Sequence, residues 1–240
     1  MGIDIEADGT IRFNGGHERL LNTSTDKNPS IRIIKGLWIQ SVFRRVQTSG
    51  DIRDGNPFIY ALKDKNGYKI DLRELWKFRK NFLAILEKAL LEIDVDYVIP
   101  MPSGHRVASY LAFQVAKRHD GLPTVISHAL RKRTVGEMLE AYADTIPNAG
   151  KHKTREYKSQ IRKWRKMPSG TFVSMKEVDN SVRNFFHPLA LSPGVGDLSG
   201  KRVLLVDDLL STGSTLKCAQ ALVEEKDATH VSALCLLSGL

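Results

Sequence analysis

Two adjacent carboxylates and a cluster of hydroxyl groups follow one short apolar stretch in the last sixth of the chain. Residues 203–206, Val-Leu-Leu-Val, suit a buried parallel strand, and Asp207 and Asp208 come directly after them. The turn at 211–215 reads Ser-Thr-Gly-Ser-Thr, and an apolar helical stripe begins at Leu216. This order of strand, acid pair, hydroxyl-rich turn and helix indicates a sugar-phosphate site in an α/β protein.

Each part of this stretch has a physical reason. The N-terminus of a helix presents unpaired backbone N–H groups and partial positive charge, so a phosphate is favoured there. Gly213 has no Cβ, which lets the backbone turn tightly and approach the anion. Carboxylates repel phosphate, so Asp207 and Asp208 suit ribose hydroxyls, directly or through a metal ion. Four side chains can donate hydroxyl hydrogen bonds to phosphate oxygens: Ser211, Thr212, Ser214 and Thr215.

Residues 203–215 resemble the phosphoribosyl-pyrophosphate (PRPP) signature of the type I phosphoribosyltransferases, in which two acids, two variable residues and Thr-Gly-x-Thr follow an apolar strand. The resemblance implies that Asp207 and Asp208, our catalytic candidates, hold the ribose 2′- and 3′-hydroxyls. It also implies that residues 211–215 hold the 5′-phosphate. The alternative is an ordinary strand–turn–helix with Ser and Thr caps.

A second strand–turn–helix precedes this motif. Residues 97–100 are expected to form a strand, and a helix is expected over about 107–119. In the resembling family, the loop after the first core strand receives pyrophosphate. The resemblance therefore implies that four residues of this loop bind pyrophosphate: Ser103, Gly104, His105 and Arg106. The alternative is a plain strand-to-helix turn.

The second core strand is expected at 124–130, and three cations follow it directly. Charge-assisted hydrogen bonds to phosphate are strong, so Arg131 and Lys132 become further pyrophosphate candidates. Orotate phosphoribosyltransferases have a similar Arg-Lys pair after this strand. A solvated basic turn is the alternative.

A basic segment lies within the insertion expected at about 131–170. The chain has 240 residues and a formal net charge of +9, and residues 151–166 alone carry eight lysines and arginines against one glutamate. The resemblance implies a mobile lid over the active site. The spacing of Tyr157, Ile161 and Trp164 indicates a basic amphipathic helix instead. Residues 151–166 could also contact nucleic acid, with the two aromatic rings stacking on a single strand.

The fold class predicted is α/β, with a Rossmann-like phosphoribosyltransferase core over 71–240 and a central parallel sheet flanked by helices. Asp71 is expected to cap a long helix whose apolar stripe includes Trp76 as a core residue. Residues 1–70 are predicted to be β-rich, as a hood or an elaboration, with hairpins at 3–13 and 58–70. Further strands are expected at 172–175 and 231–237.

The resemblance implies transfer of the phosphoribosyl group of PRPP to a nitrogenous base, with release of pyrophosphate through an oxocarbenium-like transition state. Mg²⁺ is implied as the cofactor, with no dedicated protein ligands. Val-Ile-Pro-Met-Pro at 98–102 and the basic region resemble the competence-protein-F-like branch of the family. Two alternatives stay open on the same fold: a regulator that senses PRPP, and a nucleic-acid-associated defence or toxin effector.

Compartment and partners follow from coarser features. Cys218 and Cys235 lack metal-type spacing and lie in apolar segments, which favours buried free thiols and a reducing cytoplasm. The chain shows no signal peptide and no apolar run of membrane-spanning length, so no membrane partner is expected. The resemblance leaves a homodimer open.

Overall fold

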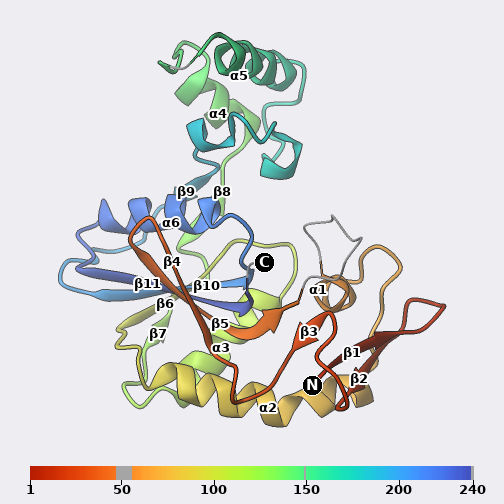
Figure 1. Ribbon diagram of the computed structural model, residues 1–240. Coiled ribbons are helices and arrows are strands. Elements are labelled where there is room, and N and C mark those ends of the chain that lie inside the picture. Colours follow the sequence, from red (N-terminus) through yellow and green to blue (C-terminus); the bar gives the residue numbers. More distant parts are fainter. Residues whose placement is uncertain (47–55, 149, 239–240) are drawn as a thin grey trace.

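A twisted, mostly parallel sheet forms the centre of the protein, as a computed structural model that describes residues 1–46, 56–148 and 150–238 shows (Figure 1). The strand order is β3-β5-β11-β10-β6-β7, and β4 pairs with β5. Strands β5, β11, β10, β6 and β7 run parallel, while β3 and β4 are antiparallel to β5. The bounds are β3 (Leu21–Asn22), β4 (Ser30–Ile34), β5 (Leu37–Arg45), β6 (Tyr97–Pro100), β7 (Thr124–Val125), β10 (Arg202–Leu209) and β11 (His230–Leu237). The predicted fold class is confirmed.

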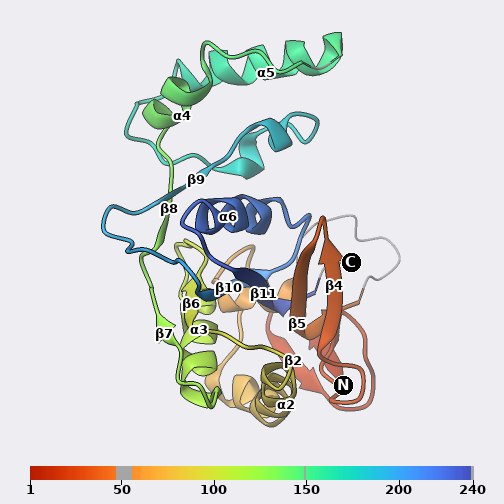
Figure 2. The same ribbon diagram turned by 90° about the vertical axis from the view of Figure 1, so that its left-hand side faces the viewer.

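Helices cover both faces of the sheet. Helices α2 (Leu72–Leu90) and α3 (Val107–Arg118) lie on one face, and α6 (Ser214–Glu224) lies on the other (Figures 1 and 2). Asp71 caps α2 as predicted, because its side chain accepts a hydrogen bond from the Glu74 N–H. The three layers therefore enclose two cores, one on each side of the sheet.

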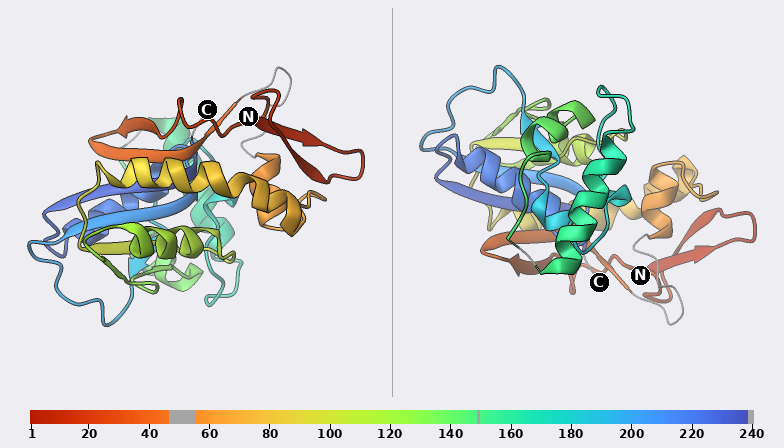
Figure 3. Two further views of the ribbon diagram at one scale, coloured as in Figure 1. Left: turned by 90° about the horizontal axis from the view of Figure 1, so that it is seen from below. Right: turned by 90° about the horizontal axis from the view of Figure 1, so that it is seen from above.

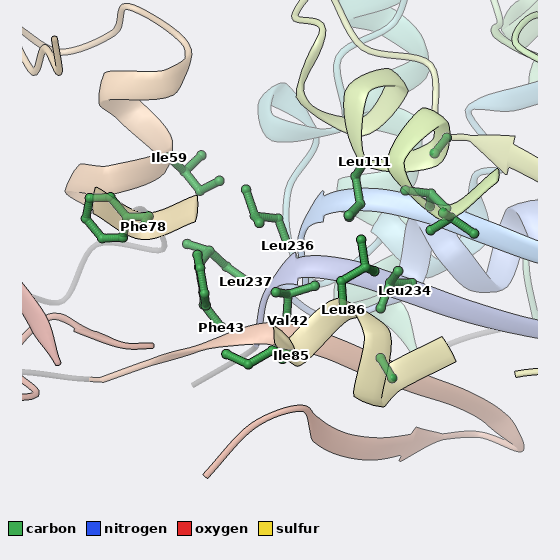
Figure 4. Packing of buried hydrophobic residues seen from close by; sticks show 14 of the residues in the cluster. Val42, Phe43, Ile59, Phe78, Ile85, Leu86, Leu111, Leu234, Leu236 and Leu237 are labelled. Carbon is green, nitrogen blue, oxygen red and sulfur yellow. The ribbon is translucent and has the colours of Figure 1, made fainter. Parts of the chain in front are cut away.

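The larger core lies between the sheet and helices α1 (Pro57–Leu62), α2 and α3. Figure 4 shows side chains of β5 and β11, such as Phe43 and Leu237, meeting Phe78 of α2. The rings of Phe58 and Phe78 have centroids 4.8 Å apart. Aromatic packing of this kind fixes the short helix α1 against the sheet.

The N-terminal region joins the core rather than standing apart from it. The hairpin predicted at 3–13 is confirmed as β1 (Gly2–Ile5) and β2 (Ile11–Asn14). Strand β5, however, lies beside β11 in the central sheet, so the α/β unit begins well before residue 71. Whether residues 1–70 cover the substrate stays a prediction.

The chain between β7 and β10 forms a helical insertion, defined here as residues 130–191. Strands β8 (Leu130–Lys132) and β9 (Leu189–Leu191) pair as its stalk. Its other elements are α4 (Val135–Tyr142), α5 (Lys151–Trp164) and the 3-10 turns η1 (Met175–Glu177) and η2 (Arg183–Phe185). The insertion stands beyond α6 and has a core of its own, built around Phe186 (Figures 1 and 3).

Four expectations about local structure are wrong. Residues 58–70 are not a hairpin, because Asn56 caps α1 and Pro57 occupies the first turn of that helix. Trp76 is 64% exposed and stacks with Arg79 instead of joining the core. The strand expected at 124–130 has only two residues in the sheet, because the chain leaves for the insertion. The segment 172–175 leads into η1 and is not a strand.

Candidate active site at the carboxyl edge of the sheet

The acid pair lies at the carboxyl end of the central strand β10. Asp207 is in register with Cys235 of β11, and Val206 is in register with Pro100 of β6. The Met101 N–H donates to the Val206 carbonyl at 2.8 Å, which joins the two neighbouring strand ends. Ligands of open α/β sheets bind at this edge. The acid pair and the loop after β6 therefore open on the same side of the sheet.

The hydroxyl-rich turn leads directly into α6, as the sequence indicated. Gly213 is the N-cap of α6 and has φ +74°, a left-handed conformation that favours glycine. The Thr212 and Ser214 hydroxyls lie 3.0 Å apart, and the side chains of Ser211, Thr212 and Ser214 are exposed. Leu216, Ala219 and Val223 are buried and hold α6 on the sheet. The turn thus presents exposed hydroxyls and a helix N-terminus together.

Lys63 joins the acid pair from the N-terminal part of the chain. Its ammonium lies 2.5 Å from Asp208 Oδ2, and the two side chains are only 16% and 8% exposed. This contact joins residues 145 positions apart, so no local sequence pattern predicts it. Lys63 is the C-cap of α1, and its N–H donates to the carbonyls of the last turn of α1.

The two carboxylates of the pair differ in environment. Burial, together with the charge of Asp208, raises the pKa of Asp207 from its usual 3.8 to about 7. The Asp208 N–H donates to Asp207 Oδ1 at 2.8 Å, which partly opposes this shift. A perturbed carboxyl at the carboxyl edge of a parallel sheet is typical of a functional site.

The pyrophosphate candidates of the loop after β6 lie close to the acid pair. The His105 N–H donates to Ser103 Oγ at 3.2 Å, and Ser103, Gly104 and Arg106 are exposed. Burial lowers the pKa of His105, and the charges of Lys65 and Lys63 lower it further, while Asp208 opposes them. His105 therefore lies within electrostatic range of both Lys63 and Asp208.

Arg131 and Lys132 lie elsewhere, in the stalk of the insertion. Arg131 forms a two-pronged ion pair with Glu137, at 2.9 and 2.5 Å, and this pair holds the pKa of Glu137 at about 2. Glu137 and Thr134 form the capping box of α4. Arg131 thus has a structural partner in the protein without ligand, while Lys132 is exposed. Their contact with pyrophosphate stays a prediction.

A cavity of about 710 Å³ lies next to the start of the hydroxyl-rich turn 211–215. Its wall includes Leu210, which directly precedes the turn, and Ser238 at the end of β11. Strands β3, β4 and β5 add the polar side chains Asn22, Ser30 and Ser41. Five charged side chains also line the cavity, so its wall is mainly polar: Glu18, Lys27, Arg32, Arg44 and Arg45.

The basic segment 151–166 forms an amphipathic helix, as its spacing indicated. Tyr157 and Trp164 are each 2% exposed and pack on Phe186, with ring centroids 4.7 Å from it in both cases. The expectation that these rings stack on nucleic acid is therefore wrong, because the insertion core covers them. All eight lysines and arginines of the segment are exposed, six of them on α5 and two, Arg165 and Lys166, in the turn that follows.

Cys218 and Cys235 are buried free thiols, as predicted. Within the described part of the chain, no cluster of three or more histidine, cysteine, aspartate or glutamate side chains is arranged to hold a metal ion. None of the helices in those same residues has the length and apolar character needed to cross a membrane.

This geometry is that of an α/β protein with a candidate sugar-phosphate site. The family model of the phosphoribosyl transferase domain matches residues 160–240. An adenine phosphoribosyltransferase of Agathobacter rectalis is 31% identical over 153 residues, which cover 63% of this chain and 77% of that protein. A crystal structure of a purine phosphoribosyltransferase from Pyrococcus horikoshii matches with 15% identity and a TM-score of 0.36, over 68% of this chain and 83% of that one.

The chain belongs to the type I phosphoribosyltransferase family, as its resemblance indicated. It is accordingly a pentosyltransferase of the class that phosphoribosylates bases with PRPP. Membership of the competence-protein-F-like branch stays a prediction.

Proposed function

We propose that the protein transfers the 5-phosphoribosyl group of PRPP to a ring nitrogen of a nucleobase, and that a purine is the first acceptor to test. The observation that carries the proposal is the meeting of the acid pair Asp207–Asp208 and the turn 211–215 at the start of α6. A purine acceptor is supported by the 31% identity to an adenine phosphoribosyltransferase.

In this reaction the bond between C1′ and the pyrophosphate oxygen breaks, and its electron pair leaves with pyrophosphate. A nitrogen of the base supplies the electron pair of the new bond to C1′. The acid pair orients the ribose by accepting hydrogen bonds from its 2′- and 3′-hydroxyls, and the turn 211–215 fixes the 5′-phosphate. Ser103, Gly104, His105 and Arg106 bind the departing pyrophosphate.

The donor set at this edge fits Mg²⁺. Asp207 and Asp208 offer hard carboxylate oxygens, and Mg²⁺ in such sites is bound by one or two carboxylates together with substrate phosphates and water. When bound, the ion would neutralise the charge that develops on pyrophosphate. This fit needs no larger cluster of protein ligands.

We assign the acceptor base to the cavity beside Leu210. Support comes from its position next to the phosphate turn and from the hydrogen-bonding side chains of Asn22, Ser30 and Ser41 in its wall. Such groups can read the polar edge of a flat heterocycle, and the aliphatic wall residues Ile31, Val46 and Leu210 can cover its faces.

The experiment that tests this function is product identification. The full chain is incubated with PRPP, Mg²⁺ and one nucleobase at a time, and mass spectrometry detects the nucleoside 5′-monophosphate. A nucleotide formed from adenine or another purine supports the proposal. Product from a pyrimidine alone would overturn the purine assignment but keep the reaction class. PRPP binding without any nucleotide product would favour a PRPP sensor.

A second candidate role concerns the exposed face of α5, which we propose as a contact for the phosphate backbone of nucleic acid. Six exposed cations on α5 and two more in the turn directly after it support this role. Because Tyr157 and Trp164 are covered, this contact would be electrostatic and independent of base stacking. A steep fall in affinity for an RNA or DNA oligonucleotide with rising salt would support this role. An affinity that is absent at 50 mM salt would refute it.

A further inference from the structure

Lys63 occupies the carboxylate that the ribose is expected to use. Its ammonium lies 2.5 Å from Asp208 Oδ2, and both side chains are largely buried. A neutral sugar hydroxyl therefore has to compete with a cation for the same oxygen, and it is the weaker partner because charge-assisted hydrogen bonds are stronger. Because a carboxylate has two oxygens and about four acceptor sites, the ammonium weakens the expected ribose contact with Asp208 rather than excluding it.

The backbone around Lys63 is firmly held, whereas its side chain is adaptable. Phe58 and Ile59 anchor α1 in the large core, and the Lys65 N–H donates to the Tyr60 carbonyl in the turn that ends the helix. A lysine side chain has four methylene groups and a compact charge, so its ammonium can move several ångströms without backbone change. Lys63 can therefore exchange partners without unfolding α1.

The loop assigned to pyrophosphate lies within electrostatic range of Lys63. The charges of Lys63 and Lys65 both act on His105, which belongs to the loop assigned to pyrophosphate. The loop after β6 supplies one further cation, Arg106. An ammonium released from Asp208 could thus turn toward the diphosphate of PRPP, which carries up to three negative charges.

We propose that Lys63 is a substrate-binding residue that passes from Asp208 to the diphosphate of PRPP when the substrate enters, which frees Asp208 for the ribose hydroxyls. This inference rests on the proposed function, because it needs PRPP as the ligand. It gives the N-terminal segment a direct part in the site. It also makes occupation of the diphosphate position a condition for full ribose binding.

The exchange predicts opposite effects on two related ligands. In Lys63→Met, PRPP should bind about tenfold to a hundredfold more weakly, because a charged hydrogen bond to the diphosphate is lost. Ribose 5-phosphate, which has no diphosphate, should bind equally well or more tightly, because its hydroxyls no longer compete with the ammonium. A lysine with a purely structural role would weaken both ligands alike.

The test is calorimetric titration of the full chain with each ligand in the presence of Mg²⁺. Lys63→Gln serves as a second variant that can still donate a hydrogen bond to Asp208, and thermal unfolding confirms that both variants are folded. Lys69→Met is the matched control, since Lys69 lies on the same connection but pairs with Asp8 on the surface. It should leave both affinities unchanged.

The outcomes separate the two proposals. Weaker PRPP binding with unchanged or tighter ribose 5-phosphate binding supports the exchange. Equal losses for both ligands, or unchanged PRPP affinity in the Lys63 variants, overturn it and leave the proposed function standing. Wild-type protein that binds neither ligand overturns the proposed function and the exchange with it.

Discussion

Replacement of Gly213 by alanine tests the phosphate turn most sharply. Gly213 has φ +74°, and an alanine there adds about 1–2 kcal/mol of backbone strain. A Cβ at this position would also lie 2.8 Å from Cδ1 of Ile34 and 3.4 Å from its Cγ2. Since Cδ1 is the end of a flexible side chain, moving it adds about 1 kcal/mol. We expect Gly213→Ala to lower the free energy of unfolding by about 2–3 kcal/mol.

The same strain should act on substrate binding. The turn can relieve it by leaving the left-handed conformation, which would re-aim the backbone N–H groups at the start of α6. We therefore expect the KM for PRPP to rise at least about tenfold, the equivalent of about 1.4 kcal/mol. Urea unfolding and steady-state kinetics measure the two effects.

Two further variants make the result interpretable. Gly200→Ala places the same strain at φ +72° in a turn with no atom within 4 Å of the added Cβ, so it should cost stability without changing KM. Adding Ile34→Ala to Gly213→Ala should remove the steric part of the penalty and leave the backbone part. Gly213→Ala protein with normal stability and normal KM would refute the assignment of the turn.

Three other substitutions test separate parts of the account. Asp208→Asn should nearly abolish PRPP-dependent turnover. Because it breaks the buried pair with Lys63, it should also lower the free energy of unfolding by about 3 kcal/mol. Undiminished turnover would refute the assignment of Asp208 to the ribose. Asp207→Asn should raise the free energy of unfolding above that of the wild type, by an amount that grows between about pH 4 and 7 and is constant above pH 7. The reason is that folded wild-type protein keeps a proton on Asp207 that the unfolded chain releases near pH 3.8. A gain that is independent of pH in urea titrations would contradict the raised pKa of Asp207. Phe186→Ala should lower the stability of the insertion by about 3–5 kcal/mol, since Tyr142, Tyr157 and Trp164 all pack on that ring. Amide hydrogens of the insertion should then exchange faster, while those of β10 and β11 stay protected. Loss of protection throughout the sheet would show that the insertion does not unfold separately.

The elements that position the site were predictable because their signals are local. An apolar run, an acid pair and a hydroxyl-rich turn are contiguous, and they form β10, the turn and the start of α6 where the sequence placed them. The spacing of Tyr157, Ile161 and Trp164 likewise predicted α5 and its buried face. In each case the residues that decide the structure lie within one or two turns of one another.

The remaining features depend on contacts between distant segments. Lys63 reaches Asp208 only because Phe58 and Ile59 pack α1 into the large core. Its helix had one overlooked local signal, the Asn56-Pro57 start, which outweighs the apparent alternation at 58–70. Arg131 was expected directly after a core strand, but the chain leaves the central sheet after Val125. Arg131 therefore lies within β8 and meets Glu137 in the stalk of the insertion.

The most direct test of the central claim is pyrophosphate release from PRPP and Mg²⁺ by the full chain, measured with and without a pool of nucleobases. The account predicts release that depends on the pool and is lost in Asp208→Asn. No release under either condition, from protein that binds PRPP, would contradict it and would leave a site that binds the substrate without transferring its ribosyl group.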